Sequence, residues 1–342
     1  MRRPSKTSVP LSVKPYVLGW ILITVSITLS LFWGEELSAQ ESALGLIEGP
    51  DLEHPRSVVM WWIRLPRLIT ALVAGAALSI TGAAMQNLMR NDLADPYLLG
   101  VASGGGLGAA LAISLGLIDR FGLWTLPLLS FVGALTASLW ADRAARAVGL
   151  DPLGLDTRAT NRLVLSGVAL NLFLSALLTL TLALSEERLS GVWRWLIGHV
   201  EGLSWRELSV MCLISSVGSI LLYSQRRALD VLPAGEEVAW TLGIEVKRAR
   251  SSILIAIALA VSAVVAHCGV IGFIGLLVPH MIRPHIIGAS HRLLALSALY
   301  GASALALCDV LSRVGPRAVP VGVITGVIGG AVFLYMQRVS AR

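Results

Sequence analysis

The sequence predicts an all-α membrane protein with about ten transmembrane helices, and three observations support this fold class. Of the 342 residues, 55% are hydrophobic and only 14% are charged, and the mean hydropathy is +0.76. These values lie outside the range of soluble globular domains. The apolar residues also fall in long uncharged runs, and the basic residues are distributed unequally between the connections. The lipid bilayer is therefore the expected solvent for most of the chain.

Nine uncharged runs are candidates for membrane-spanning helices. A helix rises about 1.5 Å per residue, so about 20 residues cross about 30 Å of hydrocarbon. The runs cover residues 16–33, 68–89, 97–118, 121–141, 163–185, 208–225, 251–282, 293–308 and 318–337. A cleaved signal peptide is the alternative for the first run. Its apolar core is longer than the usual core of about 7–15 residues, which favours a retained helix.

The run 251–282 is too long for one span. As a single helix it would be a rod of about 48 Å, and it contains His267, Gly269, Gly272 and Pro279. A break near residues 268–272 divides it into two helices and brings the total to ten. With ten spans, both termini lie on the same side of the membrane.

The distribution of lysine and arginine predicts the orientation. Across the full count of 27, these residues fall on the side of the termini twice as often as on the other side. Because positive charge is retained in the cytoplasm, both termini are expected there. Residues 1–15 and 339–342 are then tails, and 16–338 form a single transmembrane domain. The same bias accounts for the high pI. Nucleic-acid binding is not needed to explain it, since the sequence predicts no folded basic domain.

Groups for catalysis or ion coupling are scarce in the predicted spans. His267 and Asp309 fall near outer ends, where water is close, and His280 lies near an inner boundary. The three cysteines lack CxxC or Cys/His spacing, which predicts neither disulfides nor a metal site. Proton-coupled carriers and intramembrane hydrolases need mid-span ionisable groups. We therefore expect no catalytic residues, no metal and no cofactor bound by this chain.

Energy for transport would have to come from a partner, because no GxxxxGK[ST] phosphate-binding loop occurs in the sequence. The predicted cytoplasmic connection 226–250 contains a short amphipathic stretch with Glu236, Glu237 and Trp240 among apolar residues. This stretch is a candidate contact surface for an ATPase, and a solvated connector is the alternative.

Small residues recur at the spacing of helix interfaces. Gly322, Gly326 and Gly330 lie four apart in the last predicted span, and Gly104 and Gly108 repeat the spacing in the third. Close backbone packing of this kind stabilises helix pairs in lipid. The pattern is compatible with ordinary internal packing or with a face that lines a pore or a dimer interface.

Two long motifs carry a family resemblance. The first consists of RLPR at 64–67, GAAMQ at 82–86, RNDLADP at 90–96 and LGV at 99–101, and the second is GVIGFIGLLVPH at 269–280. Shorter matches are WLIG at 195–198, Trp205, residues 239–243, Asp309 with Arg313, and PVGVITG at 320–326. Together they resemble the FecCD family of type II ABC importer permeases, which includes the vitamin B12 permease. The resemblance covers residues 64–336.

The resemblance implies a fold, an assembly and a location. The fold is that of the vitamin B12 permease, with ten membrane helices per subunit in the bacterial inner membrane. Two permease subunits, as a homodimer or alternatively a heterodimer, would work with separate ABC ATPase subunits that bind ATP and Mg²⁺. A periplasmic or lipid-anchored binding protein would deliver the substrate. Membrane lipid surrounds the assembly, and nucleic acid has no role.

The resemblance also implies roles for three sets of residues. Arg64, Arg67 and Arg313 would dock the binding protein. If only their charge is considered, the alternative is that these side chains snorkel to the headgroups from the ends of spans. Coupling to the ATPase falls to residues 236–243, namely Glu236, Glu237, Ala239, Leu242 and Gly243. The cytoplasmic gate is formed by Asn91, Leu93, Thr160 and Asn161.

The substrate class implied is a ferric siderophore or a related metal chelate, with haem or cobalamin as the alternative. An ion-coupled secondary transporter and a structural or regulatory membrane protein are the competing classes. The chain departs from the family pattern at two places. Asp92 replaces the proline that many members have, and Gly329-Gly330-Ala331 replaces Gly-Ala-Pro. Asp92 adds a charge beside the predicted gate.

Overall fold

The computed structural model describes residues 14–33, 37–147, 159–184, 189–286, 290–314 and 318–340, and this part of the chain is helical without strands. The ten helices that correspond to the predicted spans are α1 (Lys14–Phe32), α4 (Leu65–Met89), α5 (Val101–Ser114), α7 (Thr125–Ala147), α8 (Ala159–Ala183), α10 (Trp205–Ser224), α13 (Val246–Cys268), α14 (Ile274–Ile282), α15 (Ser290–Ser312) and α16 (Val321–Ser340). Within the described residues, seven helical stretches are long and apolar enough to cross a membrane. The fold class is confirmed.

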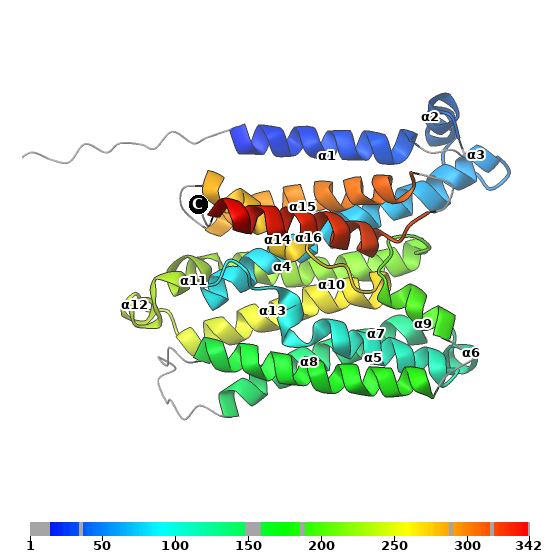
Figure 1. Cartoon of the computed structure of the whole chain (residues 1–342). Coiled ribbons are helices and arrows are strands. Elements are labelled where there is room, and N and C mark those ends of the chain that lie inside the picture. The colour runs from blue at the N-terminus through cyan, green and yellow to red at the C-terminus, as the bar shows by residue number, and fades with distance from the viewer. Residues whose placement is uncertain are drawn as a thin grey trace, which may run out of the picture.

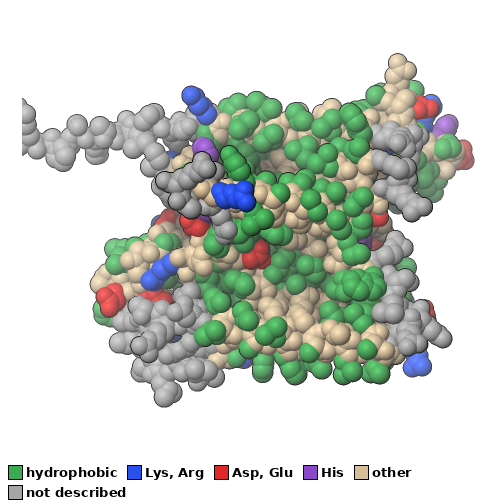
Figure 2. Space-filling view, in the orientation of Figure 1, with side chains coloured by type: hydrophobic (Ala, Val, Ile, Leu, Met, Phe, Trp, Pro, Cys, Tyr) green, Lys and Arg blue, Asp and Glu red, His purple; other side chains and the backbone are tan. Residues whose placement is uncertain are grey.

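The first and last helices end on the same side of the bundle. Figure 1 shows the start of α1, the end of α16 and the short helices α11 (Arg226–Val231) and α12 (Glu236–Thr241) at one end, called here the inner end. The opposite, outer end carries α2 (Ala39–Glu48), α3 (Pro55–Val58), α6 (Leu117–Phe121) and α9 (Leu189–Leu196). Hydrophobic side chains cover most of the flank between the two ends, and charged side chains gather at the ends (Figure 2).

The predicted break in the run 251–282 is confirmed. Helix α13 ends at Cys268, and Gly269 follows with a φ of 68° that only glycine adopts readily. The backbone at this break forms hydrogen bonds with other segments of the chain. The His199 N–H donates to the Cys268 carbonyl over 2.8 Å, and the Tyr97 hydroxyl contacts the backbone of Ile271. Because these partners satisfy the backbone groups, an irregular segment is tolerated at membrane depth.

Two other regions differ from the expected spans. The run 97–118 is not one helix, because the Asp95 carboxylate caps a short 3-10 turn, Pro96–Leu99, and Gly100 and Gly116 take left-handed conformations on either side of α5. Before α4, helix α3 continues through a π-helical stretch, Val59–Arg64. Hydrophobic periodicity does not distinguish these variants from regular helix.

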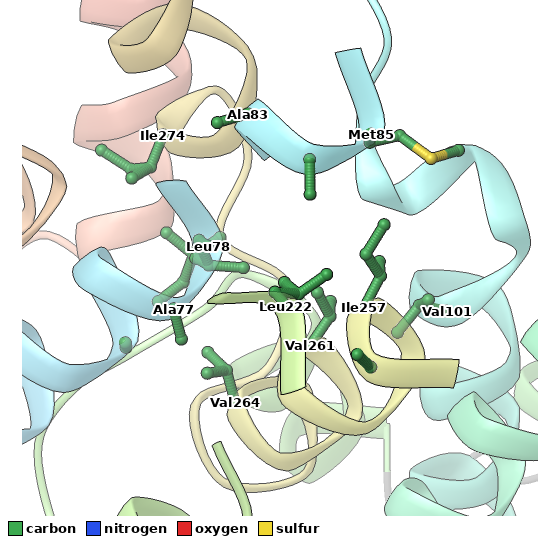
Figure 3. Close-up of a cluster of buried hydrophobic side chains, with 14 of the residues drawn as sticks. Ala77, Leu78, Ala83, Met85, Val101, Leu222, Ile257, Val261, Val264 and Ile274 are labelled. Atoms are coloured by element: carbon green, nitrogen blue, oxygen red, sulfur yellow. The ribbon is translucent and has the colours of Figure 1, made fainter. Parts of the chain in front are cut away.

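Helix α4 forms the centre of the bundle, with 18 buried residues along its 25-residue length. It packs against α15, α14, α13 and α10. Figure 3 shows part of this core, where Ala77, Leu78 and Met85 of α4 lie near Ile257 and Val261 of α13. The helix runs from the outer end to the inner end, so it joins the two regions described below.

Glycine allows α4 to approach its neighbours closely. A Cβ atom at Gly82 would lie 1.8 Å from the Gly275 carbonyl oxygen of α14. In the same way, Gly104 and Gly108 of α5 face the α7 backbone, at 2.4 Å from the Gly133 oxygen and 2.2 Å from the Leu129 oxygen. Internal packing therefore explains the Gly104 and Gly108 pattern. In the last helix, by contrast, Gly326 has no described neighbour within 4 Å.

Candidate functional site

The outer end is organised around a buried carboxylate. Asp309, in the last turn of α15, has no exposed surface. Its Oδ1 lies 2.8 Å from Nε of Arg67, in the first turn of α4, and its Oδ2 lies 3.0 Å from Nη2 of Arg313. Arg67 also pairs with the more exposed Glu201, over 2.9 Å. One carboxylate thus holds two guanidinium groups from different parts of the chain side by side.

Arg64 lies apart from this cluster. Only 3% of its surface is exposed, and its Nη1 donates to the Leu31 carbonyl over 2.6 Å and to the Ser42 hydroxyl over 3.1 Å. It therefore connects the π-helical stretch to the end of α1 and to α2. The structure brings together Arg67 and Arg313, two of the three arginines predicted to dock a binding protein. The side chain of the third, Arg64, points into the protein instead. The docking role stays a prediction for all three.

Sequence reasoning missed the burial of Asp309, which it placed near water. His267 is likewise buried, with Nδ1 2.9 Å from the Ala263 carbonyl. A carboxylate removed from water needs a cationic partner. The spacing of Asp309 and Arg313, four residues apart on one helix, indicated one such partner. No local signal indicated Arg67, which is 242 residues distant in the sequence.

The predicted coupling residues gather in α12 and the turn after it. Val238, Trp240 and Leu242 are exposed by 42%, 61% and 64%, whereas Ala239 is fully buried beneath them. Glu237 is exposed, and Gly243 turns the chain with a φ of 78°. These positions give the inner end an exposed apolar surface.

Glu236, the remaining coupling residue, faces the bundle. Its Oε1 lies 3.5 Å from Nη1 of Arg250 on α13, and both side chains are mostly buried. The Gly235 residue before it has a φ of 131°, which separates α12 from the preceding 3-10 turn, Leu232–Ala234. Glu236 therefore anchors α12 to the bundle, and the neighbouring residues carry the exposed surface.

The predicted gate residues lie at two helix ends. Asn91 and Leu93 follow α4, where Arg90 is left-handed with a φ of 52° and the Leu93 N–H donates to Asn91 Oδ1 over 2.9 Å. Leu93 is 44% exposed. Thr160 and Asn161 begin α8, but their side chains lie outside the described residues. The structure thus describes the Asn91–Leu93 half of the set.

The described residues contain no cluster of three or more His, Cys, Asp or Glu side chains suited to a metal ion. The three cysteines are free and partly or fully buried. The described ion pairs, such as Arg67–Asp309 and Arg250–Glu236, lie at the two ends of the bundle. Together with the exposed apolar surface of α12, these ion pairs make the two ends chemically different from the apolar flank.

Comparison with known proteins assigns the family. The FecCD transport family matches residues 22–338. The chain is 38% identical to the uncharacterized ABC transporter permease protein YvrB of Bacillus subtilis, covering 93% of this chain and 91% of YvrB. It is 37% identical to the cobalamin import system permease protein BtuC of Halobacterium salinarum (82% and 73% coverage) and 36% identical to the vitamin B12 import system permease protein BtuC of an Escherichia coli strain (94% and 94%).

A solved structure agrees with this assignment. An inward-facing metal-chelate type ABC transporter superposes with a TM-score of 0.79 at 27% identity, covering 94% of this chain and 97% of that one. PsaBC from Streptococcus pneumoniae, at 17% identity and a TM-score of 0.58, shares the fold. The chain is a homologue of ABC importer permeases. It belongs to the FecCD transport family, and the resemblance expected from its two motifs is confirmed.

Proposed function

We propose that this chain is the permease subunit of an ABC importer, which forms the pathway for a bulky metal chelate across the bacterial inner membrane. The family match over residues 22–338 carries the proposal. The sequence has no phosphate-binding loop of its own. A separate ATPase therefore hydrolyses ATP, and the chain itself binds no cofactor and performs no catalysis.

The ATPase docks on the surface of Val238, Trp240 and Leu242. Large exposed apolar side chains at one end of a membrane protein mark a partner interface rather than a lipid contact, because the bilayer covers the flank. Glu236 and Ala239 hold this surface in place from below, through Arg250 and through the buried core. Glu237 directly precedes this surface in the sequence, and Gly243 directly follows it.

The binding protein docks on Arg67 and Arg313. Asp309 holds both guanidinium groups in position before docking, which lowers the ordering cost of binding. A carboxylate of the partner competes with the half-exposed Glu201 for Arg67. Arg64 supports this surface indirectly, because it fixes α1 and α2 beside it.

A second copy of the chain completes the pathway, with the gate of Asn91, Leu93, Thr160 and Asn161 at its inner end. We propose a homodimer with the outward faces of α8 and α16 in its interface, where large apolar residues are exposed in the single chain, among them Phe173 at 59% and Leu334 at 63%. Two helices with such faces can pair with identical faces in a closed, symmetric assembly.

For the substrate, cobalamin is the first candidate. Two relatives at 36–37% identity are named as cobalamin or vitamin B12 permeases, and the solved relative is named as a metal-chelate type transporter. A ferric siderophore or haem is the second candidate, because these are metal chelates of similar bulk. Calorimetric titration of the cognate binding protein with cyanocobalamin, a ferric siderophore and haem distinguishes them.

Co-purification with a candidate ATPase tests the assignment. We expect a stable complex, and we expect Trp240→Glu with Leu242→Glu to abolish it because charge is placed in an apolar interface. Leu52→Glu, at an outer-end residue that is 71% exposed, is the matched control and leaves the complex intact. A chain that binds no ATPase, or a complex indifferent to the α12 substitutions, contradicts the proposal.

A further inference from the structure

Arg283 occupies a central position at the inner end. It follows α14 directly, and each of its three guanidinium nitrogens meets a different side chain. Nη1 donates to Asn87 Oδ1 over 2.9 Å, and Nη2 donates to Gln86 Oε1 over 3.1 Å. Nε forms an ion pair with Asp92 Oδ1 over 3.1 Å. One side chain thus contacts both the last turn of α4 and the turn that carries Leu93.

Asn87, one of the two amides that receive Arg283, also contacts the segment before α12. Asn87 Nδ2 donates to the Leu229 carbonyl of α11 over 3.4 Å and to the Ser290 hydroxyl of α15 over 3.0 Å. Arg90 Nε donates to the Leu232 carbonyl over 3.0 Å. The Asn87 contacts border a polar cavity of about 170 Å³, lined in part by Asn87, Leu229 and Arg283. A continuous path of contacts therefore leads from residues 226–243, called here the coupling region, to the turn at Asp92.

The two halves of this path differ in burial. Gln86 and Asn87 are 1% and 6% exposed, so their bonds to Arg283 are fixed parts of the core. The side chains of Asp92 and Arg283 are 52% and 32% exposed. An ion pair at this exposure adds little stability and is screened by salt. The Asp92 contact can therefore open at low cost, whereas the amide contacts stay closed.

We propose that Arg283 is a positioning residue that joins the coupling region to the gate turn, with Asp92 as its releasable contact. The proposal rests on the permease function proposed above. In the conformation described here, the ion pair holds the turn of residues 90–93 against the bundle. Movement of α11 and α12 reaches Arg283 through Asn87 and releases Asp92, so that Leu93 moves. Asp92, at a family proline position, makes this contact a property of this chain.

Thiol labelling of Leu93→Cys in the purified full chain tests the contact. The probe is a membrane-impermeant, charged maleimide. Adding Asp92→Asn or Arg283→Gln is expected to raise the labelling rate about two- to fivefold, the range open to an exposed ion pair. The two substitutions together give no more than Arg283→Gln alone, because that change already removes the Asp92 contact. Arg283→Lys, which keeps the charge, restores part of the protection.

Two further readouts separate positioning from general loosening. Salt at about 1 M should raise labelling of the Leu93→Cys chain but not of its Asp92→Asn derivative, since only the former has a pair to screen. Glu245→Gln removes another exposed ion pair at the inner end, with Arg248, and is the matched control that leaves the rate unchanged. Equal labelling with and without Asp92, or simultaneous labelling of the buried Cys268, overturns the proposal.

The final experiment repeats the labelling of Leu93→Cys in the complex with the ATPase. In the assembled complex, nucleotide should change Leu93→Cys labelling, and Asp92→Asn should remove that change. A nucleotide effect that is identical in both chains overturns the link from coupling to gate. Labelling of the isolated chain needs no ATPase, so failure of the Arg283 proposal and failure of ATPase association are observed separately.

Discussion

The outer and inner ends of the molecule use opposite arrangements of charge. At the outer end one carboxylate, Asp309, holds two arginines, and it is completely buried. At the inner end one arginine, Arg283, holds one carboxylate and two amides, and its carboxylate partner Asp92 is half exposed. Burial makes the outer cluster costly to break, whereas exposure makes the inner ion pair easy to break.

This difference fits the different tasks proposed for the two ends. A surface that receives a partner benefits from groups held in one geometry before binding. A gate has to leave one geometry for another, so its contacts must be close in free energy to their alternatives. Helix α4 connects the two, since Arg67 lies in its first turn and Asn87 in its last.

The largest expected effect comes from disrupting the packing of α4, the helix that connects the two ends. Gly82→Val places side-chain atoms against the Gly275 carbonyl, because even a Cβ would lie 1.8 Å from it. We expect a loss of about 3 kcal/mol or more, as for severe overpacking, measured as a lowered Tm by intrinsic tryptophan fluorescence. Gly326→Ala, with no described neighbour within 4 Å, is the control and changes Tm little. An unchanged Tm for Gly82→Val would contradict the close packing of α4 against α14 at this position.

The second effect tests the buried outer cluster. Asp309→Asn removes the carboxylate that the mostly buried Arg67 and Arg313 share, and it is expected to cost about 2–3 kcal/mol because Arg67 keeps its pair with Glu201. Thermal unfolding in detergent provides the measurement. Glu201→Gln removes the outer partner of Arg67, whose carboxylate side chain is 48% exposed, and is expected to cost no more than about 1 kcal/mol. If the two variants unfold at the same temperature, the contrast between buried and exposed pairs does not hold.

The third and smallest effect concerns pH at the inner end. Burial raises the pKa of Asp95, which caps the turn after the gate, to about 6, against the opposing hydrogen bond from Tyr97 N–H. The folded state therefore binds a proton that the unfolded state has already lost in this range, so stability rises as pH falls from 7 to 5. Asp95→Asn, which keeps the capping oxygen, should show a smaller gain in Tm over that interval.

Other carboxylates do not obscure this test. Hydrogen bonds from Ser38 and Arg56 lower the pKa values of Glu41 and Glu48, and the Glu53 N–H lowers that of Asp51. Their contribution to stability is lost only below the unfolded values near 4, outside the interval. The difference between the parent chain and Asp95→Asn also cancels the titration of histidines. An identical pH response of both chains would contradict the raised pKa.

Much of the fold was predictable because hydrophobic run length is a local property. The ten spans and the break after Cys268 followed from uncharged runs and from Gly269. The shortness of α5 was not predictable, because Gly100 lies in an uninterrupted apolar run and only its left-handed conformation separates the start of α5 from the turn before it. The motifs identified the residues at the candidate sites, but they did not identify the residues that contact them. The contacts of Arg64 with Leu31 and of Arg283 with Gln86 depend on packing between distant segments.

Transport in reconstituted vesicles tests the central claim most directly. Vesicles that contain this chain and its ATPase, with ATP on the ATPase side and the loaded binding protein on the other, should accumulate radiolabelled cobalamin or ferric chelate. We predict that accumulation requires ATP and the binding protein, and that Trp240→Glu with Leu242→Glu abolishes it. Accumulation by the chain alone, driven by an ion gradient without ATP, would contradict the account.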